Sequence, residues 1–366
     1  LDAMSPLRIA VFTDSALPIL NGVSVSIDAL VQELRNRGHG VHVFTAAHFR
    51  YRDPDPNTYR FFAVETPWTK NYPLAIPPFY PMLRHFRRHT FDLIHTHTPF
   101  TIGFVGLRWA QSHEIPIVST YHTLYDKYAH YVPLRRGVVE AAAVRLSTRF
   151  AATADAVIAP SALVRDELVG RGVRVPIAVI PTGVDLERFC PGDRAAARRR
   201  LGLPEAGAIV LYVGRLDREK SVERVLLAFE RVAGTVADAR LVLVGGGTQA
   251  GGLRRLAASL AAAERIVFLG PRPHDEVPPC YQAADLFLFA SETETQGLVL
   301  AEAAACGLPA VAVAAPGCEE IIHDGRTGVL TKSDPAALAD AAIGLLLDSG
   351  RRRAMGQRAR QVAERD

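Results

Sequence analysis

Two glutamates on either side of a glycine-containing turn form the most chemically suggestive pattern in the chain. Glu294 and Glu302 lie within the stretch SETETQGLVLAE, with a strand-like run Ala284–Ala290 before it and an apolar, alanine-rich run Leu298–Ala305 at its end. A strand, a turn and a helix place backbone N–H groups at a helix N-terminus, where a phosphate binds readily. Carboxylates accept paired hydrogen bonds from vicinal hydroxyls. We therefore expect a ligand that has both diols and phosphates, as a nucleotide sugar does.

Two cations, Arg215 and Lys220, lie close together in another predicted strand-to-helix turn. They follow the apolar run Ile209–Val213 and precede a helical pattern, Val222–Val232. An arginine and a lysine at such a turn can bind the two phosphates of a diphosphate. The alternative is that both are ordinary surface charges, but their place after a strand favours a functional role.

The histidines are the next candidates. His122 follows the predicted buried strand Ile115–Thr120, and ligands bind outside the carboxyl ends of strands in open α/β sheets. His95 and His97 share one side of another strand, as a metal pair would, but we see no third ligand. We interpret them as core or loop-bonded histidines. Near the N-terminus, Gly22 begins a helical pattern and allows a close approach to its backbone.

Composition excludes several classes of protein. The 366 residues are 49% hydrophobic and 22% charged, as in an ordinary globular protein. Lys and Arg exceed Asp and Glu by 42 − 38 = +4, which is too little for a nucleic-acid-binding protein. This excess lies in residues 1–185, a distribution that suits a surface facing an anionic membrane.

The remaining compositional features concern location. No apolar run approaches the length of a membrane-spanning helix, and residues 1–10 lack the apolar core of a signal peptide. The four cysteines are widely spaced, which favours reduced thiols. We therefore expect a cytoplasmic protein. Asp53-Pro54-Asp55 matches a short acidic metal motif, but we interpret it as a polar loop and assign no metal.

The order of the predicted elements indicates an α/β fold. Leu7–Thr13, a helical pattern ending at Gly38 and the strand Val41–Thr45 form a β-α-β unit, which implies a parallel sheet. A second strand and helix series begins after Thr182–Pro204. At this length two domains are expected, and we place them at residues 1–185 and 186–366.

One proline-rich segment of the first half is rich in aromatic and basic residues. It includes Trp68, Tyr72, Phe79, Arg84, Arg87 and Arg88. One interpretation is an interfacial element that inserts apolar side chains into a bilayer beside anionic headgroups. The other is a segment packed on its domain with a solvated basic face. A second aromatic group, including Tyr125 and Tyr128, follows His122.

Together, Gly22, His122, Gly214-Arg215, Lys220 and the two glutamates resemble the motif set of the retaining glycosyltransferases of the GT-B fold, family four. The resemblance covers nearly the whole chain. It implies two Rossmann-like parallel-sheet domains facing a central cleft, with the acceptor bound by the first domain and the nucleotide sugar by the second. It also implies catalysis without a metal or other cofactor. Family members usually end in a helix that returns to the first domain, so we expect the tail that ends at Asp366 to be truncated.

The resemblance also assigns roles. Arg215 and Lys220 match the pair that binds the donor diphosphate, Glu294 the glutamate that contacts the donor sugar, and Glu302 the ribose-binding glutamate. Gly22 matches a glycine whose backbone approaches the phosphate, and His122 a histidine that contacts the transferring sugar. The amides of Thr295, Gln296, Gly297 and Leu298 lie where relatives hold sugar and phosphate, and Arg272 is a candidate for the nucleobase pocket.

Within the family, the strings STYHTLYDKYAHYVP and SETETQGLVLAEA are similar to those of bacterial diacylglycerol glucosyltransferases. That subgroup implies glucose transfer from UDP-glucose to 1,2-diacylglycerol by an enzyme bound peripherally to the inner face of the cell membrane. It favours Trp68, Tyr72, Phe79, the three nearby arginines, Tyr125 and Tyr128 as acceptor or membrane contacts.

Several alternatives remain at this point. A mannosyl- or galactosyltransferase acting on phosphatidylinositol or a soluble sugar would share these motifs. A GT-B epimerase or phosphorylase would share the architecture, and a two-lobed binding protein would not need the Arg215 and Lys220 pair. The sequence does not predict the oligomeric state.

Overall fold

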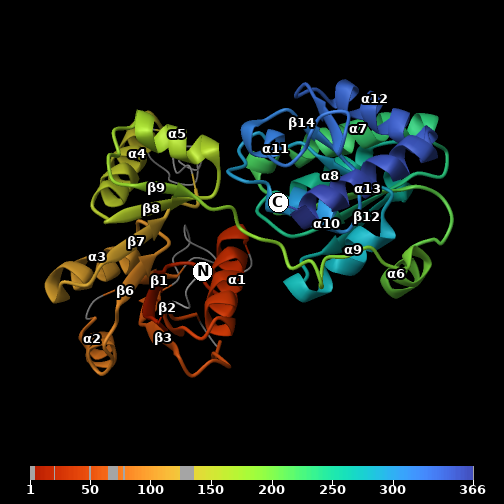
Figure 1. The fold of residues 1–366 in the computed structure, drawn as a ribbon. Coiled ribbons are helices and arrows are strands. Elements are labelled where there is room, and N and C mark those ends of the chain that lie inside the picture. Colours follow the sequence, from red (N-terminus) through yellow and green to blue (C-terminus); the bar gives the residue numbers. More distant parts are fainter. Residues whose placement is uncertain are drawn as a thin grey trace. The chain divides into compact units, whose positions relative to one another are not determined.

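The computed structural model describes residues 5–19, 21–48, 51–64, 73–76, 79–123 and 136–365, without the side chains of residues 136, 139 and 140. The chain divides into two compact units, unit 1 (Leu1–Gly183) and unit 2 (Val184–Asp366). The boundary expected from the sequence lies between residues 185 and 186. Figure 1 shows the elements of both units, which are described separately below.

Unit 1 contains a seven-stranded sheet with the order β3-β2-β1-β6-β7-β8-β9, and all its pairs are parallel. The strands are β1 (Arg8–Thr13), β2 (Gly40–Ala46), β3 (Thr58–Phe61), β6 (Leu93–Thr96), β7 (Ile117–Thr120), β8 (Ala156–Ala159) and β9 (Ile177–Val179). The helices are α1 (Gly22–Asn36), α2 (Tyr80–Arg87), α3 (Thr101–His113), α4 (Arg136–Ala152) and α5 (Ala162–Gly170). The short strands β4 (Ala63–Val64) and β5 (Leu74–Ala75) form a separate antiparallel pair.

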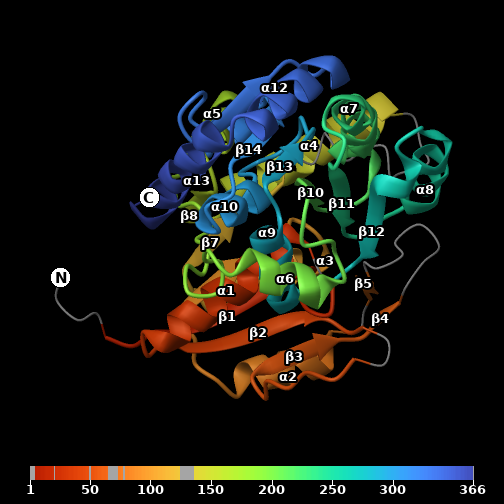
Figure 2. The ribbon, with the colours of Figure 1, turned by 90° about the vertical axis from the view of Figure 1, so that its right-hand side faces the viewer.

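The alternation of side chains along β1 explains why helices cover both faces of this sheet. Successive residues of a strand point to opposite faces. Ile9 and Val11 join Ile27 and Val31 of α1, whereas Ala10 and Phe12 join a second cluster that includes residues of α2, α3 and α4. Figure 2 shows α1 and α2 on opposite sides of β1, β2 and β3.

Unit 2 contains a six-stranded parallel sheet with the order β12-β11-β10-β13-β14-β15. The strands are β10 (Ile209–Val213), β11 (Arg240–Val244), β12 (Ile266–Gly270), β13 (Leu286–Phe289), β14 (Ala310–Val313) and β15 (Gly328–Thr331). The α-helices are α6 (Arg194–Leu201), α7 (Val222–Thr235), α8 (Ala250–Ser259), α9 (Pro278–Ala283), α10 (Leu298–Ala305), α11 (Pro316–Glu319), α12 (Pro335–Leu347) and α13 (Ser349–Arg365). Short 3₁₀ turns lie at η2 (Arg218–Lys220), η3 (Ala263–Arg265) and η4 (His274–Glu276).

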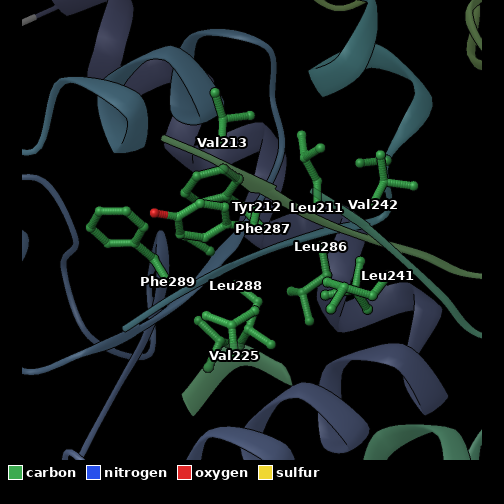
Figure 3. Packing of buried hydrophobic residues seen from close by; sticks show 14 of the residues in the cluster. Leu211, Tyr212, Val213, Val225, Leu241, Val242, Leu286, Phe287, Leu288 and Phe289 are labelled. Atoms are coloured by element: carbon green, nitrogen blue, oxygen red, sulfur yellow. The ribbon is translucent and has the colours of Figure 1, made fainter. Parts of the chain in front are cut away.

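The core of unit 2 is built around its two central strands. All five residues of β10 and all four of β13 are buried. Figure 3 shows Tyr212 of β10 beside Phe287 and Phe289 of β13, with Leu288 above Val225 of α7. Strands buried on both faces read as continuous apolar runs, which is why both were recognisable in the sequence. The predicted α/β fold with two parallel-sheet domains is confirmed.

Candidate active site

The candidate residues of unit 2 gather where the order of the strands reverses. From β10 the chain adds β11 and β12 on one side, and from β13 it adds β14 and β15 on the other. Ligands in open α/β sheets bind at such a switch point, outside the carboxyl ends of the strands. The two segments that leave β10 and β13 carry Arg215, Lys220 and Glu294. The topology therefore places the predicted diphosphate-binding cations and the first glutamate at one edge of the sheet.

Arg215 is held by two carboxylates from its own loop. Its guanidinium nitrogens lie 2.8 Å from Oδ2 of Asp217 and 2.5 Å from Oε1 of Glu219, and both carboxylates are buried. The other oxygen of Asp217 accepts hydrogen bonds from the backbone N–H and the hydroxyl of Thr248, each at 2.7 Å. Asp217 therefore joins the segments that follow β10 and β11, and it orients the Arg215 side chain, which is 26% exposed.

Lys220 and Glu294 form an ion pair between the two switch-point segments. Nζ of Lys220 lies 2.6 Å from Oε1 of Glu294, and the two side chains are only 13% and 12% exposed. Burial alone would raise the pKa of Glu294, but the charge and hydrogen bond of Lys220 outweigh it, so the pKa lies below its usual value. Glu294 is therefore a carboxylate at neutral pH, suited to accepting hydrogen bonds from sugar hydroxyls.

Close backbone contacts at two glycines position the Glu294 loop. Gly297 lies at the N-cap of α10 in the left-handed conformation, with φ of 70°, which glycine adopts without steric cost. A Cβ on Gly317, in α11, would lie 2.4 Å from the carbonyl oxygen of Glu294. Any larger residue at position 317 would push the Glu294 backbone away. The loop therefore depends on a neighbour that the sequence pattern did not indicate.

Glu302 lies on α10 and is held by two side chains from preceding elements. Its Oε1 lies 2.8 Å from Nε2 of His274, in η4, and its Oε2 accepts a 2.6 Å hydrogen bond from the hydroxyl of Tyr281, in α9. Burial, together with the Glu302 charge, raises the pKa of Tyr281 well above its ordinary value, so its hydroxyl stays a donor. The ring of Phe189 packs against both His274 and Tyr281. Each carboxylate oxygen keeps a lone pair for a ligand hydroxyl.

The other predicted donor contacts surround these two groups. Thr295 and Gln296 lie between Glu294 and α10, and Leu298 is the first residue of that helix. Arg272 follows β12, where one guanidinium nitrogen lies 3.5 Å from Glu276. Its Nε atom is buried and has no hydrogen-bond partner within the described part of the chain. That unpaired donor is compatible with the predicted base contact, which stays a prediction.

Unit 1 has its own switch point, between β1 and β6. Asp14, directly after β1, accepts hydrogen bonds from Thr98 at 2.6 Å and from the backbone N–H of Ile102 at 3.0 Å, at the start of α3. Burial raises the pKa of Asp14. Gly22 is the first residue of α1, after the N-cap Asn21, and no atom of the described chain lies within 4 Å of a Cβ built on it. The chain's own packing does not require glycine there, so the open space suits an approaching ligand.

His122 belongs to a buried row of three histidines. Its Nε2 lies 2.9 Å from Nδ1 of His97, whose ring centroid is 4.1 Å from that of His95. Nε2 of His95 bonds in turn to the hydroxyl of Thr120 at 2.7 Å. Burial lowers the pKa of His95 to about 4 and that of His122 to about 3, so both rings are neutral at physiological pH. A neutral imidazole presents one donor and one acceptor, which suits contact with an uncharged hydroxyl.

Most apolar side chains of α2, and Phe79 just before it, pack on the core of unit 1. Phe86 is buried in the core of unit 1, Met82, Leu83 and Phe79 pack against that core, and the Phe79 ring meets Phe61 edge-on at 5.4 Å. Arg84, Arg87 and Arg88 are exposed. These apolar residues are packed as the second interpretation expects. Tyr80 of the same helix is 59% exposed, and bilayer contact by the segment stays a prediction. Trp68, Tyr72, Tyr125 and Tyr128 lie outside the described residues.

The two aspartates of the Asp53-Pro54-Asp55 motif form ion pairs with arginines of unit 1. Asp53 pairs with Arg60, and Asp55 lies 2.8 Å from Arg35. No group of three or more potential metal-binding side chains was found among the described residues. None of the helices in the described ranges has the length and apolar character needed to span a bilayer.

Sequence reasoning missed the residues that hold the predicted ones in place. Asp217 and Glu219 alternate with cations in RLDREK, and this alternation of charge is the pattern that indicates ion pairs within the loop. His274 and Tyr281 lie far from Glu302 in the chain, and no local pattern joins them. His97 was seen, but only the sheet register places it beside His122, because β6 and β7 are neighbours.

Comparison with known proteins agrees with this geometry. Two family models match the chain, Glycosyltransferase Family 4 over residues 20–188 and Glycosyl transferases group 1 over residues 193–362. The alpha-monoglucosyldiacylglycerol synthase of Streptococcus pneumoniae is 33% identical over 340 residues, covering 88% of this chain and 75% of that protein. The GDP-mannose-dependent alpha-mannosyltransferase of Mycobacterium tuberculosis is 32% identical over 335 residues, covering 89% and 84%.

A solved structure extends the likeness to the whole fold. The sucrose-phosphate synthase of Thermosynechococcus elongatus superposes with a TM-score of 0.82 at 26% identity, covering 98% of this chain and 94% of that one. Three kinds of observation indicate the same family: the two parallel sheets, the cations and glutamates at the switch point, and these relatives. The chain belongs to the family 4 glycosyltransferases, enzymes of the GT-B fold.

Proposed function

We propose that the protein transfers a hexose, glucose from UDP-glucose, to the free hydroxyl of 1,2-diacylglycerol and retains the α-anomer. The observation that carries this proposal is the partly buried Lys220–Glu294 pair, with Arg215 nearby, at the switch point of unit 2. It combines cations for a diphosphate with a carboxylate for sugar hydroxyls. The likeness to an alpha-monoglucosyldiacylglycerol synthase supports the lipid acceptor.

Arg215 and Lys220 would act by electrostatics. As the bond between sugar and diphosphate breaks, negative charge grows on the leaving phosphate, and fixed cations stabilise that charge in the transition state. The ion pairs with Asp217, Glu219 and Glu294 hold both side chains in place before the donor binds. Little reorganisation is then needed when the charge develops.

The carboxylates serve best as ligands for hydroxyls. A glycosidase-type double displacement needs a second carboxylate about 5 Å from the first. In the described structure both Glu294 and Glu302 are instead engaged by side chains of unit 2. We propose that Glu294 binds the sugar and Glu302 the ribose, and that the leaving phosphate helps to deprotonate the acceptor on the same face. This reaction uses the donor as a substrate and requires no other cofactor.

Unit 1 would bind the acceptor and add two contacts to the donor. We propose that the backbone at Gly22 meets the donor phosphate and that the neutral His122 contacts the transferring sugar. A diacylglycerol acceptor resides in a bilayer, so we also propose peripheral association with the inner face of the cell membrane.

The test is to offer radiolabelled UDP-glucose, UDP-galactose and GDP-mannose separately, each with diacylglycerol in non-ionic detergent micelles. Label should enter the lipid fraction from UDP-glucose, and the product should be cleaved by an α-glucosidase but not by a β-glucosidase. GDP-mannose deserves a full arm because a relative of similar identity is GDP-mannose-dependent. Transfer from GDP-mannose alone, or to no lipid, would overturn the proposal.

A further inference from the structure

Two of the free cysteines, Cys190 and Cys306, lie on neighbouring segments of unit 2. In this unit α13 lies beside α10 (Figure 2). One guanidinium nitrogen of Arg360, in α13, donates hydrogen bonds to the carbonyl oxygens of Phe189 at 2.9 Å and Ala305 at 2.6 Å. Those two residues immediately precede the cysteines. The shared arginine therefore holds the chain beside Cys190 close to the end of α10.

A second contact, just after the two cysteines, aligns the segments. Cγ of Pro191 lies 3.6 Å from a Cβ built on Gly307. Contacts thus join the residues before the two cysteines and the residues after them, which places Cys190 beside Cys306. A disulfide needs Cα atoms about 4.4–6.8 Å apart. Directly opposed residues on adjacent segments of chain have that separation.

The two thiols differ in their access to solvent. Cys190 is partly exposed, whereas Cys306 is buried at the C-terminal end of α10. Burial, together with the charges of Glu302 and Cys190, raises the pKa of the Cys306 thiol above its usual value. A small oxidant in solution therefore reaches Cys190 first. Cys306 is available only to a group that already lies beside it.

This pair of thiols adjoins the residues that hold Glu302. Cys306 follows Glu302 by one helical turn on the same face of α10, and its backbone N–H donates to the Glu302 carbonyl oxygen at 3.0 Å. On the other segment, the ring of Phe189 packs against His274 and Tyr281, which both engage the carboxylate of the same glutamate. A bond between the two segments thus acts on both sides of the predicted ribose contact.

We propose that Cys190 and Cys306 form a modification site, at which a peroxide creates a disulfide and thereby weakens binding of the nucleotide sugar. The Cys190 thiolate attacks one oxygen of hydrogen peroxide, and the O–O bond breaks. The sulfur becomes a sulfenic acid, and the departing hydroxide takes the proton that the thiol released. The Cys306 thiol then forms the S–S bond, and the sulfenic oxygen leaves as water. Two thiols and one peroxide thus give one disulfide and two waters.

The disulfide would displace the groups around Glu302. It draws the two sulfurs to about 2.05 Å, well inside the contact distance of packed thiols. Close-packed segments have little free space to absorb that change, so Phe189 and the end of α10 must shift. The shift disturbs the hydrogen bonds that His274 and Tyr281 make with Glu302. The effect on donor binding rests on the proposed role of Glu302 as the ribose contact, whereas formation of the disulfide does not.

Reduced thiols, as expected from the sequence, are the resting state of such a site. Disulfides in cytosolic proteins are usually transient and catalytic or redox-sensing. A reversible bond beside the donor site would lower transfer under oxidising conditions and restore it on reduction.

The experiment treats the reduced full chain with hydrogen peroxide, digests it without reductant and searches by mass spectrometry for peptides joined through Cys190 and Cys306. Isothermal titration with UDP-glucose, and in parallel with GDP-mannose, measures donor binding before and after oxidation. Wild type should yield the joined peptides and bind the donor roughly tenfold more weakly after oxidation. Dithiothreitol should reverse both changes.

Three variants identify the thiols involved. Cys190→Ser replaces a partly exposed side chain, so it should fold and bind the donor like wild type, with no change after peroxide. Cys306→Ala tests the buried partner in the same way, and circular dichroism checks that it is folded. The matched control Cys280→Ala removes a buried thiol of α9 and leaves the pair intact, so it should respond to peroxide as wild type does.

Three results would overturn the inference: no joined peptides from oxidised wild type, joined peptides without a change in donor affinity, or an equal response to peroxide in Cys190→Ser. Reduced protein that binds GDP-mannose and not UDP-glucose would refute the proposed donor. The response to peroxide measured with GDP-mannose would then still decide whether the two cysteines act as proposed.

Discussion

The candidate residues of the two units differ in charge. In unit 2 the candidate residues are charged, and Arg215, Lys220 and Glu294 are held by opposite charges of the same unit. In unit 1 the two candidates for contact with the donor are uncharged, since Gly22 has no side chain and burial keeps His122 neutral. The difference fits their proposed ligands. The cations of unit 2 would offset the charge of the diphosphate, whereas a backbone contact at Gly22 and a sugar contact at His122 need only aligned donors and acceptors.

Among the variants that test this difference between the units, loss of the Lys220–Glu294 pair should have the largest effect on activity. Lys220→Ala removes a cation from the growing charge on the phosphate and should lower kcat by roughly 100- to 1000-fold. It also leaves the Glu294 carboxylate without its partner, which costs about 3–5 kcal/mol for a fully buried pair and less here. The double variant Lys220→Met/Glu294→Gln separates the two effects, since its thermal stability should recover while its activity does not. Turnover at the wild-type rate in Lys220→Ala would refute the assigned role.

The neutral histidines of unit 1 predict that this unit loses stability as the pH falls from 6.5 to 5. Burial lowers the pKa of His95 to about 4 and that of His122 to about 3, against 6.5 for an unperturbed histidine. As pH falls below 6.5 the unfolded chain binds protons that the folded chain does not. Each such histidine then lowers the free energy of unfolding by about 1.4 kcal/mol per pH unit at most, down to its folded pKa.

Hydrogen exchange measured at several pH values, corrected for the intrinsic rates, would test this difference. Amides of β6 and β7 should lose protection between pH 6.5 and 5 more steeply than those of β10 and β13. His95→Gln should flatten the slope for unit 1. Equal slopes in the two units would contradict the prediction.

A variant beside Glu302 should have a smaller effect, which is on binding of the nucleotide sugar. Tyr281→Phe removes the 2.6 Å hydrogen bond that orients the Glu302 carboxylate. A hydrogen bond to a charged group contributes about 1.5–3 kcal/mol, so the KM for the nucleotide sugar should rise about tenfold with a smaller change in kcat. Tyr59→Phe is the matched control, since it removes a hydroxyl bonded to His89 in unit 1. An unaltered KM in Tyr281→Phe would mean that Glu302 is oriented without it.

The smallest effect should come from His97, which contacts the predicted sugar-binding histidine but is not itself proposed to contact the ligand. His97→Phe removes the 2.9 Å contact with His122 and frees its ring orientation. Imperfect alignment should lower kcat roughly five- to tenfold and leave the donor KM nearly unchanged. His95→Gln is the comparison, because His95 bonds to Thr120 and not to His122. Equal losses in the two variants would indicate a structural role for the whole row.

Much of the fold could be predicted from local patterns. The apolar runs of β10 and β13 and the helix Leu298–Ala305 were visible because buried parallel strands and helices leave distinct periodicities. Arg215, Lys220 and Glu294 could be selected because they lie in predicted strand-to-helix turns, and Glu302 because it lies on the helix that follows one. The role of α2 could not be decided, since an apolar helix face is the same pattern whether it meets a core or a bilayer.

The sequence by itself determined which residues could do chemistry and the order of the strands and helices along the chain. Only the tertiary structure decided how those residues are paired. Strand order brings the segments after β10 and β13 together and sets His97 beside His122. The charge of Lys220 keeps Glu294 ionised despite its burial, whereas burial removes the charge of His122. Ionisation depends on solvent access and neighbouring charges, and both are properties of the folded chain.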